Sequence, residues 1–149
     1  MKVIADKDAQ TSEREVIEIS IPCSIDLIVL ARFAAATIGA RAGFDLDEID
    51  DLRLAVDELS VSFGPLNRET CFRFEFSRDS DTVTVRCTHE PTLDINNGSS
   101  DAEFNVINWE QARELSQQLL HELVDVYGHE VQNGRSVAWL KKQHGASAR

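Results

Sequence analysis

The sequence predicts an α+β fold, in which a mostly antiparallel sheet carries three helices on one face as a two-layer sandwich. Three observations support this fold class. Short runs alternate apolar with polar residues, as half-buried strands do. Longer segments repeat apolar residues at steps of three and four, as amphipathic helices do. These segments follow the order strand, helix, helix, hairpin, long loop, helix and hairpin, which one helix-covered sheet can accommodate.

The length and composition of the chain fit one globular domain. Its 149 residues are 42% hydrophobic and 28% charged, which is ordinary for a protein with a buried core. We expect a single domain at residues 15–142, with flexible segments at 1–14 and 143–149. No run of about 18 apolar residues and no signal-peptide core occurs. We therefore expect a cytoplasmic protein that does not enter a membrane.

Charge and cysteine content exclude several classes of function. The net charge of −11 disfavours direct binding of nucleic acid, because phosphates would be repelled, and it fits a basic protein partner or simply solubility. Cys23, Cys71 and Cys87 are odd in number and far apart, so we expect reduced thiols. The histidines lack the spacing of metal ligands, and the glycines do not cluster as in a phosphate-binding loop. No metal site is predicted.

The first predicted strand and helix lie near the N-terminus. In the segment 17–21 isoleucine alternates with polar residues, and Pro22 ends the strand because it cannot donate a ladder hydrogen bond. Ser24 can cap a helix that continues to about Ala42, and Gly43 can terminate it.

Arg32 lies among the apolar residues of this first helix, one turn after Ile28. Its stem can cover apolar surface while the guanidinium reaches water, and sequence alone favours this interpretation. An arginine in this position can also anchor a carboxylate of a partner protein. Both interpretations stay open at this point.

The second predicted helix spans residues 44–63 and has a clear beginning. Asp45 and Glu48 have the spacing of a capping box. One apolar stripe follows it, made by Ile49, Leu52, Val56, Leu59 and Phe63. A second row beside the stripe consists of Asp51, Ala55, Glu58 and Ser62. Glu58 and Ser62 can border a pocket, although spacing alone favours a solvated helix flank.

The second half of the chain predicts two hairpins and a third helix. Phe72, Phe74 and Phe76, and then Val83, Val85 and Cys87, form the inner faces of two strands joined by a polar turn at 77–81. Asn108 can cap a helix with a core stripe of Ala112, Leu115, Leu119, Leu123 and Val126, with Gly128 near its end. Asn133-Gly134 predicts a tight turn in the last hairpin, between 129–132 and 135–141.

The segment 89–107 shows neither helical nor strand periodicity. A loop of this length within a compact domain is usually functional or disordered. It can close over a small ligand, or it can pack into a pocket and fill it. We expect the cleft between Glu58 and this loop to be reduced or blocked.

Arg32, the segment 49–58 (IDDLRLAVDE) and the closing helix and hairpin together resemble bacterial anti-sigma factors of the stress-response and sporulation type. These are serine-protein kinases of the RsbW type, built on the GHKL (Bergerat) ATPase fold. The resemblance covers the chain from about Val16 to Lys142. Its most specific part is LAVDE, which is similar to the start of the family's N-box helix. The interval between Arg32 and Glu58 also resembles the interval between the family's partner-binding arginine and its N-box glutamate.

The resemblance implies a degenerate nucleotide site. Glu58 falls at the N-box glutamate, whereas Ser62 replaces the asparagine that holds Mg²⁺. His89 and Pro91 stand where the family has an adenine-binding aspartate-x-glycine box, and no glycine lies near 114–116, where a second glycine box is expected. Phosphoryl transfer needs several such contacts together. No cofactor is therefore expected. ATP with Mg²⁺ would bind only if the nucleotide site is retained.

The function that the resemblance implies is sequestration of an alternative sigma factor without catalysis, reversed by an anti-anti-sigma antagonist of the STAS type. Arg32 would anchor the partner, with Ile28 and Val29 in the contact. The alternative is an active ATP-dependent serine-protein kinase that phosphorylates its antagonist. The family often forms homodimers, which this sequence neither supports nor opposes.

Overall fold

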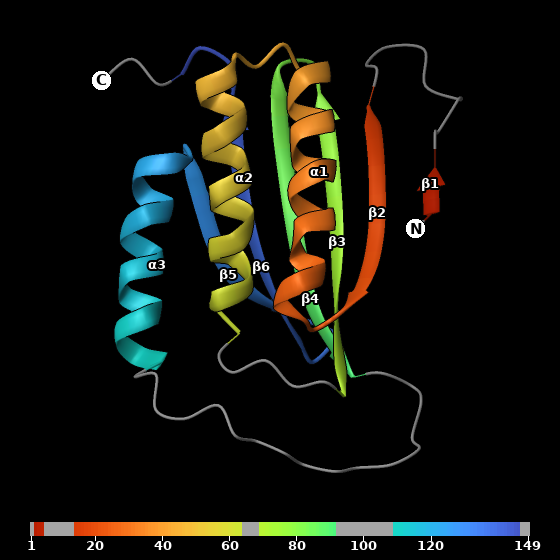
Figure 1. The fold of residues 1–149 in the computed structure, drawn as a ribbon, viewed down its shortest axis with the longest axis vertical. Helices are drawn as coiled ribbons and strands as arrows, with labels where there is room; N and C mark the ends of the chain where they lie inside the picture. The colour runs from red at the N-terminus through yellow and green to blue at the C-terminus, as the bar shows by residue number, and fades with distance from the viewer. Residues whose placement is uncertain (1, 5–13, 64–68, 92–108, 147–149) are drawn as a thin grey trace.

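The computed structural model describes residues 2–4, 14–63, 69–91 and 109–146, and side chains are described within 14–63, 69–90 and 110–146. A six-stranded sheet in the order β1-β2-β3-β4-β6-β5 carries three helices (Figure 1). Every strand pairing is antiparallel. The predicted α+β class with an antiparallel sheet is confirmed.

The elements begin and end close to the predicted positions. The strands are β1 (Lys2–Ile4), β2 (Glu15–Pro22), β3 (Thr70–Asp79), β4 (Thr82–Pro91), β5 (Val126–Gln132) and β6 (Arg135–Gln143). The helices are α1 (Ile25–Arg41), α2 (Leu46–Val61) and α3 (Trp109–Leu123). Figure 1 shows α1 and α2 side by side across the sheet, with α3 beyond α2 near β5. None of the described helices combines the length and the apolar character needed to cross a membrane.

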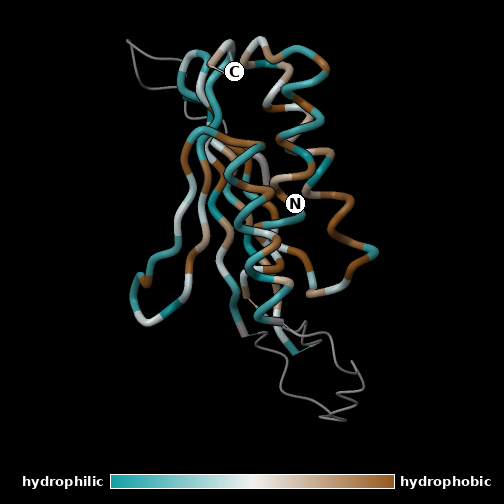
Figure 2. The backbone as a smooth tube through the Cα atoms, turned by 90° about the vertical axis from the view of Figure 1, so that its left-hand side faces the viewer, coloured by the Kyte–Doolittle hydropathy of each residue, from teal (hydrophilic) through white to brown (hydrophobic). Residues whose placement is uncertain are grey.

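The core lies between the helices and one face of the sheet. Strand register aligns Ile19 with Phe74, Phe74 with Cys87 and Cys87 with Ala138, so their side chains form one row on the inner face. All four are buried, and Phe74 is flanked along β3 by Phe72 and Phe76, which are also fully buried. Figure 2 shows the alternating hydropathy of the strands that this arrangement requires. The predicted inner faces of β3 and β4 are confirmed.

Several local signals at helix ends and turns are confirmed, although Ser24, at the N-cap position of α1, makes no side-chain capping hydrogen bond. The backbone N–H of Glu48 donates to Asp45 Oδ1 at 2.8 Å, and Glu48 Oε2 accepts from the Asp45 N–H at 2.9 Å, which completes the capping box. Gly43 follows α1 with a φ of +84°. Asn133 and Gly134 have φ values of +53° and +77°, as a tight hairpin turn requires.

The predicted core stripe of α3 is wrong for Leu115 and Leu119, whereas Leu123 packs against the core as predicted. Leu115 and Leu119 are 57% and 40% exposed, and the buried row contains Ser116 and Leu120. Neighbouring rows lie about 100° apart on a helix, so choosing a row that is off by one residue predicts the wrong buried face.

Two further expectations about the end of α3 are also wrong. Val126 belongs to β5 and is half exposed. Gly128 does not mark the end of a helix but lies in β5, opposite Trp139. The helix ends earlier than the periodicity suggests, because α3 ends at Leu123 and Val126 already pairs with β6.

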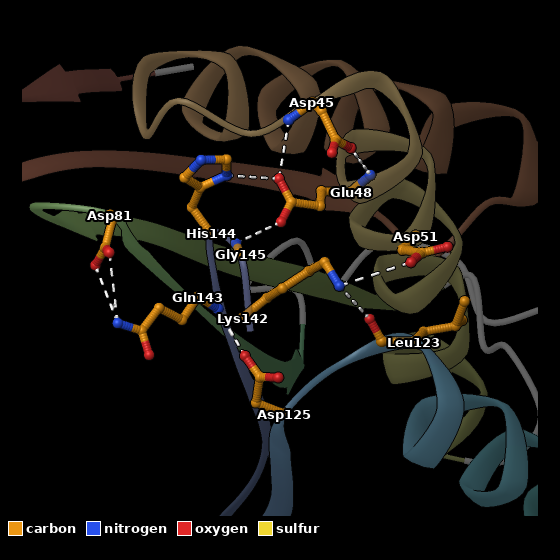
Figure 3. Close-up of polar contacts among 10 residues, drawn as sticks. All are labelled: Asp45, Glu48, Asp51, Asp81, Leu123, Asp125, Lys142, Gln143, His144 and Gly145. Atoms are coloured by element: carbon orange, nitrogen blue, oxygen red, sulfur yellow. Dashed lines mark hydrogen bonds and ion pairs between the residues drawn. The ribbon is translucent and has the colours of Figure 1, made fainter. Parts of the chain in front are cut away.

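Strand pairing and contacts extend beyond the predicted bounds of the domain. Lys2–Ile4 pair antiparallel with β2, within the segment 1–14 that was expected to be flexible. Within the expected tail at 143–149, Gln143 ends β6 and the next two residues bind α2. His144 Nδ1 lies 2.8 Å from Glu48 Oε2, and the Gly145 N–H donates to Glu48 Oε1 at 2.7 Å (Figure 3).

A buried lysine joins three elements near the same end of the sheet. Lys142 on β6 is 2% exposed, and its Nζ donates to the carbonyl oxygen of Leu123 at the end of α3, at 2.8 Å (Figure 3). Asp51 Oδ2 on α2 lies 3.6 Å from the same ammonium. Lys142 thereby satisfies a carbonyl at the helix C-terminus, where a cation is favourable.

Candidate functional site

The residues that the sequence singled out lie along α2 and the neighbouring faces of α1, α3 and the sheet. They do not form one cluster. Arg32 and Val29 lie on α1, and Glu58 lies on the second half of α2. Ser62 directly follows α2 as its C-cap residue, and His89 lies near the end of β4. In the described part of the chain, no hydrogen bond or ion pair joins Glu58, Ser62 and His89 to one another. Each of the three has a different partner.

Arg32 is paired across the α1–α2 contact. Its Nε lies 3.0 Å from Asp57 Oδ1, and the two side chains are 36% and 30% exposed. Both atoms are buried, and their contact is not aligned as a hydrogen bond, so the attraction is that of an ion pair. Burial raises the pKa of Asp57; the positive charge of Arg32 opposes this shift, and the negative charge of Glu58 adds to it. A partner carboxylate that binds Arg32 would compete with Asp57.

The first half of α1 exposes large apolar side chains beside Arg32. We call Ile25, Val29, Leu30 and Phe33 the α1 ridge; Ile25 and Phe33 are 62% and 64% exposed. The predicted contact residue Val29 belongs to it. Ile28, by contrast, is buried in the core, so its side chain offers little surface for the predicted contact.

The exposure of the α1 ridge follows from how α1 packs. Its buried face contains small residues, Ala31, Ala35 and Gly39, so the helix can approach α2 and the sheet closely. Ile28 and Ile38 are buried on this same face, and the residues of the α1 ridge lie outside it. Small residues on one face and large apolar residues on the other are a sequence signal for an exposed ridge, which the prediction did not use.

Glu58 is bound by a residue of α3. The hydroxyl of Ser116 donates to Glu58 Oε2 and lies 3.4 Å from the carbonyl oxygen of Glu58. Ser116 is 2% exposed, whereas Glu58 is half-buried. The carboxylate that the resemblance assigns to catalysis therefore stabilises the α2–α3 contact. Sequence reasoning missed Ser116, since its partner is 58 residues away.

Ser62 ends α2 and uses its hydroxyl locally. The hydroxyl donates to the carbonyl oxygen of Leu59, one turn earlier in the same helix. This is a common C-terminal arrangement for serine and leaves the oxygen lone pairs free. Ser62 is half-buried and borders a cavity. It can accept one more hydrogen bond from a molecule in that cavity.

His89 belongs to a cluster of rings. Its Nε2 lies 2.8 Å from Thr70 Oγ1, and its ring centroid is 5.5 Å from Phe63 and 5.6 Å from Phe72. Burial lowers the pKa of His89, so the ring is neutral at pH 7. The contacts assign His89 to packing at the end of the sheet.

A cavity of about 350 Å³ lies between the end of α2, α3 and the strands β5 and β6. Leu59, Leu120 and Ala138 contribute apolar walls, and Ser62 and Tyr127 contribute hydroxyl groups. Neither Glu58 nor His89 lines it. The expected reduction of a cleft by the loop at 89–107 stays a prediction, because residues 92–108 lie outside the described residues, as does the predicted cap Asn108.

The three cysteines lie near one another, because Cys23 interacts electrostatically with both Cys71 and Cys87. Cys23, Cys71 and Cys87 are free thiols, and burial raises the pKa of Cys23 and Cys87. Within the described ranges, no three His, Cys, Asp or Glu side chains are placed to hold one metal ion.

Comparison with known proteins adds no family to this geometry. No protein-family model matches the chain, and no curated protein matches it in sequence. The resemblance to anti-sigma factors therefore stays a prediction.

Proposed function

We propose that this protein is a non-catalytic anti-sigma factor that sequesters a sigma factor through α1 and is released by an anti-anti-sigma antagonist. The single observation that carries the proposal is the α1 ridge next to Arg32. Exposed apolar residues that surround a charged group are typical of a protein-binding surface. The sequence resemblance places the partner-binding arginine at this same position.

The proposed partner surface combines apolar contact with one charge. Ile25, Val29 and Phe33 follow at steps of four along α1, so they can pack against a partner helix as one row. Arg32 lies beside this row and can form a bidentate contact with a partner carboxylate. Since both a sigma factor and its antagonist would need this row, their binding would be mutually exclusive. Sigma-factor binding also implies a cytoplasmic location.

The absence of catalysis is proposed from the contacts of the three nucleotide-site candidates. Glu58 accepts a hydrogen bond from Ser116, and His89 packs between phenylalanine rings. Ser62 has a shorter reach than the asparagine it would replace. Because phosphoryl transfer depends on precise positioning of metal, phosphate and nucleophile, these contacts favour binding without chemistry.

The experiment is an affinity pull-down of purified sigma factors from the source organism, followed by calorimetry on any that binds. Phe33→Asp places a charge in the α1 ridge, and Leu46→Asp is its control, since Leu46 is 80% exposed at the far end of the α1–α2 pair. Arg32→Gln removes the anchor, with Arg53→Gln as its control. We expect Phe33→Asp and Arg32→Gln to weaken binding at least tenfold and both controls to leave it unchanged.

Two results would contradict this proposal. If no sigma factor binds the wild-type protein, the function is wrong. If a sigma factor binds wild type and Phe33→Asp equally, the α1 ridge is not the contact.

The alternative function is an ATP-dependent serine-protein kinase. The retained carboxylate of Glu58 and the cavity beside Ser62 favour it. Calorimetric titration with ATP and Mg²⁺, followed by phosphate transfer to the antagonist, separates the two functions. A micromolar dissociation constant for ATP corresponds to a binding free energy of about −8 kcal/mol. Together with phosphate transfer to the antagonist, it would show that the protein is a kinase and would refute our proposal.

A further inference from the structure

The cavity between α2, α3 and the last hairpin differs from the rest of this acidic chain in its charge, because an arginine and no acidic side chain belong to its described lining. Among its described lining residues there is no aspartate or glutamate, although the chain contains 26 acidic residues. Three nitrogen-containing side chains line the cavity instead: Arg113, Gln117 and His129. Arg113, Gln117 and Leu120 follow at steps of four and three, so one face of α3 presents all three to the cavity.

The walls and the rim of the cavity differ in character. Leu59, Leu120 and Ala138 are buried and form an apolar interior. Arg113 and Gln117 are exposed at the α3 side, so their polar ends lie toward water. A volume of about 350 Å³ with apolar walls and a few polar groups is typical of small-molecule sites.

We propose that this cavity binds a small monocarboxylic acid with an apolar body, the body against Leu59, Leu120 and Ala138 and the carboxylate on Arg113. A planar guanidinium matches a carboxylate with two parallel hydrogen bonds. Gln117 can donate to the same carboxylate, and Ser62 can accept a hydrogen bond from a polar substituent.

A single negative charge fits the cavity better than a polyanion. Arg113 is the only side chain of the described lining that is cationic at every pH of interest. The chain as a whole carries a charge of −11, which opposes the approach of a triphosphate more strongly than that of a monoanion. The proposed ligand therefore differs from the nucleotide that the sequence resemblance implies, and this inference does not rest on the anti-sigma function.

The test is a titration of the ¹⁵N-labelled full chain with 3-phenylpropanoate, with its neutral amide 3-phenylpropanamide as the matched ligand. The amide signals of Gly128, His129 and Gln117 report on the cavity. Arg113→Gln removes the proposed anchor, and Arg53→Gln on the outer side of α2 is the control. A parallel titration uses ATP with Mg²⁺.

We expect 3-phenylpropanoate to shift the three cavity signals and to bind at least about tenfold more weakly to Arg113→Gln than to wild type, because the charge-assisted hydrogen bonds of the guanidinium are lost. Arg53→Gln should bind like wild type, and the neutral amide should bind both arginine variants alike. The proposal is overturned if the acid fails to shift these signals at millimolar concentration. The proposal is also overturned if the acid and the amide bind equally, or if Arg113→Gln binds the acid as tightly as wild type does. Binding of ATP with Mg²⁺ in the cavity, without binding of the acid, would overturn it as well.

Discussion

Replacing Glu48 by alanine should destabilise the protein far more than replacing the neighbouring first-turn acid, Asp47. The Glu48 side chain is 5% exposed and accepts hydrogen bonds from the Asp45 N–H, the Gly145 N–H and His144. It therefore caps α2 and binds the end of β6 at the same time. Asp47 is exposed, so its substitution tests only the general effect of an acid at a helix N-terminus.

The size of this effect follows from the contacts. A helix-cap interaction contributes about 1 kcal/mol, and a hydrogen bond to a charged group about 1.5–3 kcal/mol. The cap and the bond from Gly145 together predict a loss of about 3 kcal/mol for Glu48→Ala. For a domain of this size that loss lowers the midpoint of thermal unfolding by about 6–12 °C. Asp47→Ala should cost less than about 1 kcal/mol.

The same contact should make stability depend on pH. Burial pushes the pKa of Glu48 upward, but hydrogen bonds from Gly145, His144 and Asp45 outweigh this and lower it below 4.5. The hydrogen bond and charge of Glu48, with smaller effects from Asp45 and Asp81, raise the pKa of His144 above 6.5. The contribution of Glu48 is complete above pH 4.5 and is lost as pH falls through its lowered pKa. That of His144 is complete below pH 6.5 and is lost as pH rises through its raised pKa.

Urea unfolding from pH 4 to pH 9 measures both effects. Wild type should be stabilised by this pair most fully between pH 4.5 and 6.5, and His144→Gln should lose less stability than wild type from pH 6.5 upward. Equal destabilisation by Glu48→Ala and Asp47→Ala would refute the role of the buried carboxylate. Identical pH profiles for wild type and His144→Gln would refute the ion pair.

Three further predictions concern packing. Lys142→Met leaves the carbonyl oxygen of Leu123 without its donor and should lower the free energy of unfolding, measured in urea, by about 1–3 kcal/mol. Lys141→Met replaces the exposed neighbour and should change it very little. Equal losses in the two variants would contradict the hydrogen bond from Lys142 to Leu123. Gly128→Ala places a Cβ 2.7 Å from Trp139 Cζ2 and should lower the free energy of unfolding by about 1–3 kcal/mol. The displaced indole should also alter the near-ultraviolet circular dichroism, so an unchanged spectrum would count against this contact. In the native protein a thiol reagent should modify Cys71 before the two buried cysteines, so equally fast modification of all three would be inconsistent with their burial.

Much of the fold was predictable because it depends on residues close together in the sequence. The alternation of Phe72, Phe74 and Phe76 specifies one inner face of a strand wherever that strand lies. The capping box depends on two residues three positions apart, and the last hairpin turn on Asn133 and Gly134. Each of these signals needs only backbone geometry and its neighbours.

The candidate site was predictable only in part. Spacing correctly placed Glu58 and Ser62 on the flank of α2, and the structure places Ser62 at a cavity. Spacing did not show that Ile28 is buried while Phe33 is exposed, because α1 is apolar around most of its circumference. On such a helix the buried face is chosen by fit against neighbouring elements, and here the small residues Ala31 and Ala35 fit best.

What the sequence alone determined about this protein is therefore its set of helices, strands and turns, and with them its α+β class. The tertiary structure decided which of several possible faces became the core and which polar groups met. Glu48 and His144 are 96 residues apart, and Glu58 and Ser116 are 58 apart. The periodicity of the sequence cannot predict such pairs, because a hydrogen bond between distant residues forms only after packing has brought their elements together.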